Sequence, residues 1–238
     1  MKKLLLVCAS IVVLLSLISC ENIFSSSLAT WAARTDYGDL SKLSYNEASS
    51  LLKNALANNN AELARGLVPV FTKFLKETEK TDPTYTTKGK ELFDALFMGS
   101  NLAESYNMLA TSLLSNPEPD ENFLNDIAED ISGIILWNDA YSDAMMLCLE
   151  SELFTVLDPN ALALAAFVLV FDVGNDLELN TLNPQSITDQ ADIDRLLESQ
   201  QFQVVLAIIE VLESANPETA PFIALFSDLF GNLSNLNP

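Results

Sequence analysis

The chain has 238 residues, 49% of them apolar and only 7 of them glycine, a composition typical of a globular protein rather than a disordered one. It contains no histidine, which removes the usual metal ligand and every catalytic mechanism that needs an imidazole base. The formal net charge of -21 repels phosphate backbones, so we expect no nucleic-acid partner.

The first nineteen residues are expected to direct secretion. Lys2 and Lys3 give a basic start, and the apolar run at 4–18 is shorter than the roughly twenty residues that a membrane-spanning helix needs. A basic start, an apolar middle and a small-residue end are typical of a cleaved signal peptide. We therefore predict that residues 1–19 are removed and leave them out of the fold.

The apolar run ends in Leu17-Ile18-Ser19-Cys20, which resembles the lipobox of bacterial lipoproteins. The resemblance implies that the Cys20 sulfur takes a diacylglyceryl group, that cleavage falls between Ser19 and Cys20, and that the freed amine is a further site for a fatty acid such as palmitate. Two or three acyl chains hold a protein durably at a membrane, because each buried methylene contributes roughly 0.8 kcal/mol. The resemblance thus implies a lipid-anchored, extracytoplasmic protein of the bacterial cell envelope. An uncleaved anchor helix, or an ordinary secretory signal with an incidental cysteine, is the alternative.

Residues 20–43 are expected to form the lipidated amino terminus and a tether, and residues 44–115 to form helical hairpins. Ser44 and Glu47 have the spacing of a capping box, and an apolar stripe of helical period follows them to about residue 58. Three asparagines at 58–60 then turn the chain into a second helix. A second hairpin is predicted from about 87 to 114, with a pause at Gly99.

Residues 116–120, with the sequence NPEPD, are the clearest break in the chain, and we predict a proline-rich linker there. Residues 121–238 are expected to form an acidic helical region. Within it, apolar stripes run to about Ile135 and from Ala140 to Phe154, and Asp158 and Pro159 are a good helix start. The following residues are apolar on every side, so we predict a buried central helix over 159–173.

The chain as a whole is predicted to be all-α, an irregular bundle or a short solenoid of antiparallel helical hairpins with about ten helices. Two intervals between its prolines, Pro83 to Pro117 and Pro184 to Pro217, are 34 and 33 residues, close to the tetratricopeptide period. On this spacing the body is remotely similar to degenerate tetratricopeptide-like helical-repeat lipoproteins.

Charge is distributed unevenly along the chain. Residues 21–90 hold nine basic and eight acidic side chains, whereas residues 91–238 hold twenty-five acidic side chains and one basic residue, Arg195. A surface of that kind is repelled by anionic headgroups, so we expect the acidic region to point away from the membrane. Any charged partner is expected to be basic.

The cysteines exclude a disulfide framework. Cys8 leaves with the signal peptide and Cys20 is expected to be lipidated, so Cys148 has no intramolecular partner. We interpret Cys148 as a small buried apolar residue, with a reactive thiol as the alternative.

The sequence contains no cofactor signature, and we expect no cofactor and no metal site. Two groups of oxygen ligands could in principle hold calcium, but neither follows the EF-hand spacing, and aspartates at helix boundaries usually cap helices or face solvent. These groups are Asp189, Asp192 and Asp194, and separately Asp172, Asn175, Asp176 and Glu178.

Paired carboxylates and aromatic side chains are the remaining candidates for chemistry. Neighbours one or two positions apart on a helix do not face each other, so the pairs Glu129 with Asp130 and Glu150 with Glu152 are not expected to act as an acid and a base. Two groups of aromatic residues could line a ligand groove, although a packing role is the simpler interpretation. These groups are Trp31, Tyr37 and Tyr45, and separately Trp137 with Tyr141.

We therefore expect a binding protein and not an enzyme: a scaffold or accessory subunit that presents an acidic helical surface to another envelope protein. The alternative is a carrier for a small apolar or cationic ligand in an uptake system. Such a ligand would lie in a cavity beside residues 161–171, lined by Phe167, Phe171 and Met146.

Overall fold

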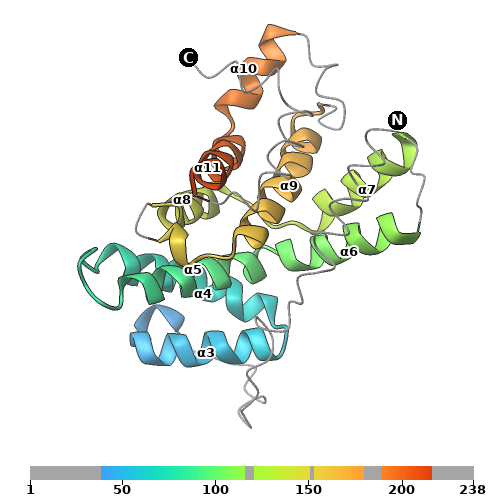
Figure 1. Ribbon diagram of the computed structural model, residues 1–238. Helices are drawn as coiled ribbons and strands as arrows, with labels where there is room; N and C mark the ends of the chain where they lie inside the picture. The colour runs from blue at the N-terminus through green and yellow to red at the C-terminus, as the bar shows by residue number, and fades with distance from the viewer. Residues whose placement is uncertain (1–38, 116–120, 151–152, 180–188, 216–238) are drawn as a thin grey trace. The chain divides into compact units, whose positions relative to one another are not determined.

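The computed structural model describes residues 39–115, 121–150, 153–179 and 189–215 of the chain (Figure 1). These residues form nine α-helices and two short 3-10 helices, and no strand occurs among them. The prediction of an all-α protein is confirmed, and the helix count of the described part is close to the ten expected.

The chain divides into two compact units that alternate along the sequence. We call the described residues of 39–103 and 136–157 the amino-terminal unit, and those of 104–135 and 158–215 the carboxy-terminal unit. The amino-terminal unit therefore includes residues 136–157, which follow the predicted linker in the sequence. The linker itself, at 116–120, lies outside the described residues and stays a prediction.

The amino-terminal unit is a group of packed helices in which α4 lies against both α3 and α5, and α8 packs on α5. Its buried side chains include Leu52, Leu67, Phe71, Leu92 and Met145. The elements are η1 (Leu40–Lys42), α3 (Tyr45–Ala57), α4 (Ala61–Lys76), α5 (Tyr85–Gly99), α8 (Asp139–Cys148) and η2 (Phe154–Val156).

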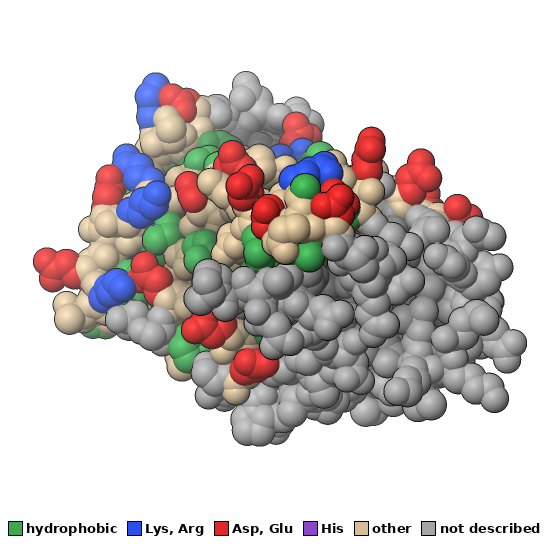
Figure 2. Space-filling view, turned by 90° about the horizontal axis from the view of Figure 1, so that it is seen from above, with side chains coloured by type: hydrophobic (Ala, Val, Ile, Leu, Met, Phe, Trp, Pro, Cys, Tyr) green, Lys and Arg blue, Asp and Glu red, His purple; other side chains and the backbone are tan. Residues whose placement is uncertain are grey.

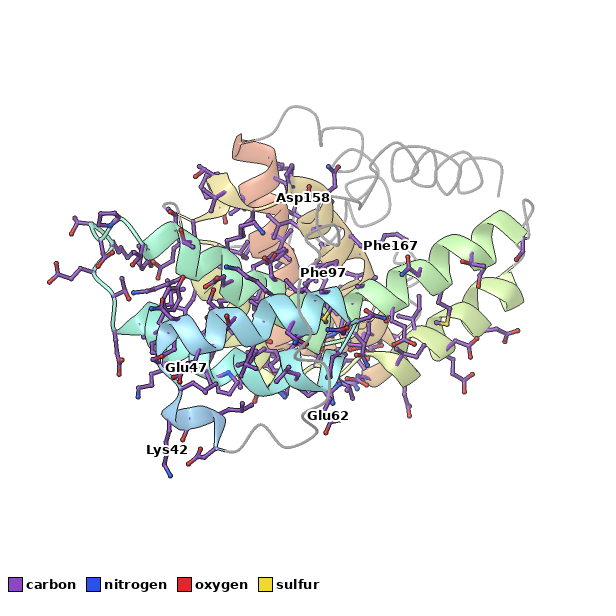
Figure 3. The ribbon with its side chains drawn as sticks, turned by 90° about the horizontal axis from the view of Figure 1, so that it is seen from below. Lys42, Glu47, Glu62, Phe97, Asp158 and Phe167 are labelled. Carbon is purple, nitrogen blue, oxygen red and sulfur yellow. The ribbon has the colours of Figure 1, made fainter. Side chains whose placement is uncertain are left out.

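Local side-chain chemistry starts the first two long helices where the sequence predicts. The Glu47 carboxylate accepts hydrogen bonds from the Ser44 backbone N–H at 2.9 Å and from the Ser44 hydroxyl at 2.7 Å. Figure 3 shows Glu47 on the first turn of α3, close to η1, which carries Lys42. The Asn60 side chain accepts from the Leu63 N–H at 3.0 Å and so caps α4. Each helix therefore begins directly after its capping residue.

A glycine allows α4 and α5 to approach closely. A Cβ atom at Gly99 would lie 2.7 Å from the Cα and the backbone nitrogen of Arg65. The Arg65 side chain then turns back, and its Nε donates to the Gly99 carbonyl oxygen at 3.0 Å. Only a residue without a side chain fits this crossing.

The carboxy-terminal unit is built around α9. Figure 1 shows α9 between α7 and α11, both of which pack against it. Every residue from 161 to 170 is buried, which confirms the predicted buried central helix, and the helix continues to Asp176 rather than ending near 173. The elements are α6 (Leu102–Ser115), α7 (Glu121–Ile134), α9 (Pro159–Asp176), α10 (Gln190–Glu198) and α11 (Gln200–Ala215).

The apolar stripe that runs from Ala140 to Phe154 does not form one helix. α8 ends at Cys148, where the Leu149 N–H is shared between the carbonyl oxygens of Met145 and Met146, and Phe154 begins the separate helix η2. Such a tightened last turn closes a helix because it satisfies the final carbonyl groups. The apolar residues continue past Cys148, but the helical conformation of the backbone ends there.

Candidate functional site

The residues for which the sequence makes its strongest functional prediction lie outside the described part of the chain. These are Ser19 and Cys20, together with the tether aromatic residues Trp31 and Tyr37. Lipidation and cleavage there stay predictions. Within the described residues, no helix combines the length and the apolar character that crossing a membrane would require.

An acidic stripe runs along the exposed face of α7. Asp126, Glu129, Asp130 and Gly133 are all exposed, and their spacing of three, four and seven residues places them on one face of the helix. The opposite face carries Ile131, which is fully buried. We call Asp126, Glu129 and Asp130 the α7 acidic stripe.

The rest of the carboxy-terminal unit adds to this negative charge. Exposed acidic residues also lie on or beside α9, α10 and α11, namely Asp176, Glu178, Asp189, Asp194, Glu198, Glu210 and Glu213. Over 104–135 and 158–238 the chain has nineteen acidic residues against the single basic residue Arg195. Figure 2 shows acidic side chains scattered over the visible described surface, whereas lysine and arginine side chains lie mainly on its left.

Arg195 is already engaged by its own unit. Its guanidinium lies 3.2 Å from the Asp192 carboxylate and donates to the Leu177 carbonyl oxygen at 3.1 Å. The pair is exposed, so its contribution to stability is small, but it occupies the one arginine. The one basic residue of the unit therefore pairs with Asp192 and not with the α7 acidic stripe.

The first group of aspartates that could bring oxygen ligands together is used for local structure instead. Asp189 caps α10 by accepting from the Ala191 N–H at 2.9 Å, Asp192 pairs with Arg195, and Asp194 accepts from the Gln190 side chain at 2.8 Å. Across the part of the chain that the structure describes, no three acidic or cysteine side chains gather closely enough to hold a metal ion.

The second group separates into a buried residue and exposed ones. Asp172 is only 6% exposed, whereas Asp176 and Glu178 lie at the surface. Glu178 has a positive φ of 57°, which places it at a turn after α9. The Asn175 side chain is not among those that the structure describes.

Asp172 forms a polar contact in the core of the carboxy-terminal unit. Gln201, on α11, donates from Nε2 to the Asp172 Oδ2 at 2.9 Å and to the Leu169 carbonyl oxygen at 3.1 Å. Burial raises the pKa of Asp172 to about 6; the negative charge of Asp176 adds to the rise, and Gln201 and Ser132 oppose it. A carboxyl group in such a place is poised to exchange a proton near neutral pH.

A partly buried carboxylate, Glu91, joins α3 to α5 in the amino-terminal unit. The Ser49 hydroxyl donates to Glu91 Oε1, while Glu91 Oε2 is buried and makes no hydrogen bond. The Tyr45 hydroxyl has a raised pKa because it is buried and because the Glu91 carboxylate is near. The Lys88 ammonium lies 5.1 Å from the centre of the Tyr45 ring. These contacts hold two helices together, and they form no open site.

Of the two candidate carboxylate pairs, the structure describes both members only for Glu129 and Asp130. Glu129 and Asp130 both face solvent as part of the α7 acidic stripe. Glu150 accepts from the Tyr85 hydroxyl at 3.0 Å and pairs with Lys80 at 2.6 Å, and Glu152 lies outside the described residues. Glu150 therefore links α5, the α4–α5 connection and the end of α8.

Cys148 is fully buried and free, as predicted for a small apolar residue. Its Sγ lies 3.8 Å from the Gly89 carbonyl oxygen. Burial raises the pKa of the thiol, and the negative charges of Asp94 and Glu150 raise it further. The reactive thiolate is therefore disfavoured in the folded chain.

The aromatic residues that the structure describes have packing roles. The ring centroids of Trp137 and Tyr141 lie 5.9 Å apart in an edge-to-face arrangement, and Trp137 Nε1 donates to the Ser142 hydroxyl at 3.0 Å. Tyr45 packs edge-on against Phe71 and Phe74. These contacts support the packing interpretation over a ligand groove.

The residues named for a ligand cavity are divided between the units. Phe167 is buried within the carboxy-terminal unit, Met146 is 45% exposed on α8 of the amino-terminal unit, and the Phe171 side chain is outside the description. A small-molecule ligand stays a prediction that no observation here favours.

Sequence reasoning missed the hydrogen-bond partners of the Asp172 and Glu91 carboxylates. Asp172 stands out as a lone acid after a run of apolar residues, and that signal could have marked it as a buried polar residue. No comparable signal marks the other polar residues of these contacts, because each is an ordinary polar residue within a helical pattern: Gln201, Ser132, Ser49 and Glu91.

Comparison of the chain with protein families, curated proteins and solved structures finds no match.

Proposed function

We propose that this protein is a lipid-anchored, extracytoplasmic lipoprotein of the bacterial cell envelope that acts as a helical scaffold or accessory subunit. Two features support the proposal. One is the lipobox-like segment Leu17 to Cys20, and the other is the exposed α7 acidic stripe in a part of the chain, 104–135 and 158–238, that holds nineteen acidic residues and one arginine. The stripe carries the binding part of the proposal.

The proposed mechanism is tethering. An acyl anchor at Cys20 confines the helical body to a layer near the membrane, which raises its effective concentration for other proteins of that layer. Charge complementarity then selects a basic surface as the partner and speeds the encounter. A weak interface is sufficient under these conditions.

The anchor is tested by intact-mass spectrometry and membrane fractionation of the protein made in its own host. We expect a chain that starts at Cys20 and carries added lipid mass, and we expect Cys20→Ala to abolish both the lipid mass and membrane association. Cys148→Ala is the matched control, because it removes a cysteine that is buried and free. An uncleaved leader, or a processed chain without lipid, would contradict the proposed anchor.

The binding surface is tested with a photo-crosslinking amino acid at Gly133. This position is exposed beside the α7 acidic stripe, and a Cβ atom built there meets nothing within 4 Å, so a larger side chain is tolerated. We expect irradiation of intact host cells to give one dominant adduct with a protein whose contact peptide is rich in lysine and arginine.

Charge-neutralised variants identify the contact that forms this adduct. Replacing the stripe by Asp126→Asn, Glu129→Gln and Asp130→Asn should reduce the adduct at least fivefold. The matched control neutralises three exposed acids of the amino-terminal unit, Glu62→Gln, Glu77→Gln and Glu79→Gln, and should leave the adduct unchanged. Equal loss in both triple variants, or no adduct at all, would refute the stripe as the binding surface.

A further inference from the structure

Asp172 is an unusual residue for its position. It is 6% exposed on α9, directly after a stretch in which residues 161–170 are all buried. Acidic side chains are almost never buried to this degree unless they are paired. The side chains that act on the Asp172 carboxyl are Gln201, Ser132 and Asp176, and none of them is basic.

The two polar neighbours from other helices connect Asp172 to α11 and α7. Gln201, on the first turn of α11, donates through one amide nitrogen to both Asp172 Oδ2 and the Leu169 carbonyl oxygen of α9. Ser132, on α7, has a buried hydroxyl oxygen that makes no hydrogen bond within normal distance. The same hydroxyl is a donor toward the Asp172 carboxylate and, like Gln201, opposes the rise in its pKa. Three helices thus meet around one carboxyl group.

The charges around this junction all disfavour ionisation. Asp176 lies one turn further along α9 and adds negative charge. The single arginine of the unit is held by Asp192 and by the Leu177 carbonyl oxygen, and no charged residue of α7 or α11 acts on the Asp172 carboxyl. A neutral carboxyl group, in contrast, can accept from Gln201 and donate its own O–H toward Ser132.

We infer that Asp172 is a proton-binding site at the junction of α7, α9 and α11, and that the packing of α7 and α11 on α9 tightens when this site is protonated. Proton uptake removes the charge that the packing of α7 and α11 on α9 buries, and this gain outweighs the weaker contacts that Gln201 and Ser132 make with a neutral carboxyl. The unit would therefore respond to the pH of its surroundings. This inference does not depend on the lipid anchor or on the partner.

The direction of the pH effect follows from linkage. The carboxyl pKa is about 6 in the folded unit against 3.8 for an ordinary aspartate, so the folded unit binds more protons than the unfolded chain between these values. The stability that this group provides is present at low pH and is lost as the pH rises through the folded pKa. Above that value no further change is expected.

Hydrogen–deuterium exchange of the full-length chain at pH 5.0 and pH 7.5, corrected for intrinsic exchange rates, tests the inference. We expect the amides of α11 and of the last turns of α7 to be about tenfold more protected at pH 5.0 than at pH 7.5, because pH 5.0 lies one unit below the folded pKa of about 6. Asp172→Asn is a neutral isostere, and it should remove this difference and keep the higher protection at both values.

Two controls separate this site from the general acidity of the unit. Asp176→Asn and Glu213→Gln each remove one exposed negative charge. Asp176→Asn should lower the transition pH slightly, since Asp176 raises the Asp172 pKa, and Glu213→Gln should leave it unchanged. If Asp172→Asn follows the wild-type pH dependence, or if Glu213→Gln removes as much of it as Asp172→Asn does, the inference is wrong.

A direct titration keeps the test decisive if Asp172→Asn fails to fold. Carboxyl ¹³C NMR of aspartate-labelled wild-type protein should show one resonance with a midpoint near pH 6. Gln201→Met removes the donor that lowers the Asp172 pKa, so the midpoint should rise and the exchange transition in α11 should move with it. A set of aspartate midpoints all below pH 5 would overturn the inference.

Discussion

Gly99 and Gly133 are both helical glycines, and their surroundings are opposite. Gly99 lies where α5 crosses α4, with the Arg65 backbone where a side chain would go, whereas a Cβ at Gly133 meets nothing within 4 Å. The sequence marks Gly99 only as a pause between two helices. The requirement for glycine there comes from a second helix.

Gly99→Ala should destabilise the amino-terminal unit by about 1–3 kcal/mol, because the new methyl group meets backbone atoms that cannot rotate away. Urea unfolding monitored by circular dichroism measures the loss. Gly89→Ala should cost less, since the three atoms nearest to its Cβ belong to the Leu153 side chain and not to a backbone.

Gly133→Ala is the contrasting case. Alanine in an open helical position gains about 0.5–1 kcal/mol over glycine, so this variant should be neutral or more stable in the same unfolding measurement. If Gly99→Ala is as stable as wild type or more stable, as expected for Gly133→Ala, the close crossing does not require glycine.

Cys148 should be unreactive in the folded chain, because burial and two nearby carboxylates raise its pKa. In the Cys20→Ala background without the leader, iodoacetamide at pH 8 should leave Cys148 unmodified for as long as the chain is folded. In urea it should react at the rate of a free thiol. Rapid modification without denaturant would contradict the buried position.

The helix starts are the best predicted features at the scale of the element. Ser44 with Glu47, and Asp158 with Pro159, start helices where the sequence predicts, because a cap is made by residues only two or three positions from the helix it begins. The turn predicted at 58–60 also precedes a helix, which Asn60 caps. Helix ends are less predictable. The stripe from Ala140 to Phe154 breaks after Cys148, where apolar spacing alone indicates no stop.

Asn60→Ala should destabilise α4 by about 1 kcal/mol, because the Leu63 N–H loses its hydrogen-bond acceptor at the start of the helix. Asn60→Asp is the control, since aspartate keeps a capping oxygen and should retain the wild-type stability. Urea unfolding distinguishes the two variants. If both lose the same stability, the capping contact is not what Asn60 contributes.

At the scale of the molecule, the two units differ in charge. Over 19–103 and 136–157 the chain has nine basic and fourteen acidic residues, whereas the carboxy-terminal ranges have one basic and nineteen acidic. Charge repulsion of this kind opposes a compact state, and salt screens it beyond a Debye length of about 10 Å at 0.1 M. The charge asymmetry therefore predicts a salt-dependent difference in stability.

Raising NaCl from 20 mM to 500 mM should increase amide protection in α7, α9 and α11 more than in α3, α4 and α5. Hydrogen–deuterium exchange reads both units in one sample, so the amino-terminal unit serves as the internal control for general effects of salt. An equal change in both units would show that net charge does not limit the stability of the carboxy-terminal unit.

The sequence by itself determined the all-α class, the starts of the helices, the buried central helix and the uneven charge, because periodicity and capping act over a few neighbouring residues. It also carries the predicted anchor at Cys20. The tertiary structure alone decided which polar side chains meet, as with Gln201 and Asp172, 29 residues apart, or Ser49 and Glu91, 42 residues apart. It also placed residues 136–157 with the amino-terminal unit. Such contacts depend on how helices pack face to face, and no local pattern in a single sequence records that packing.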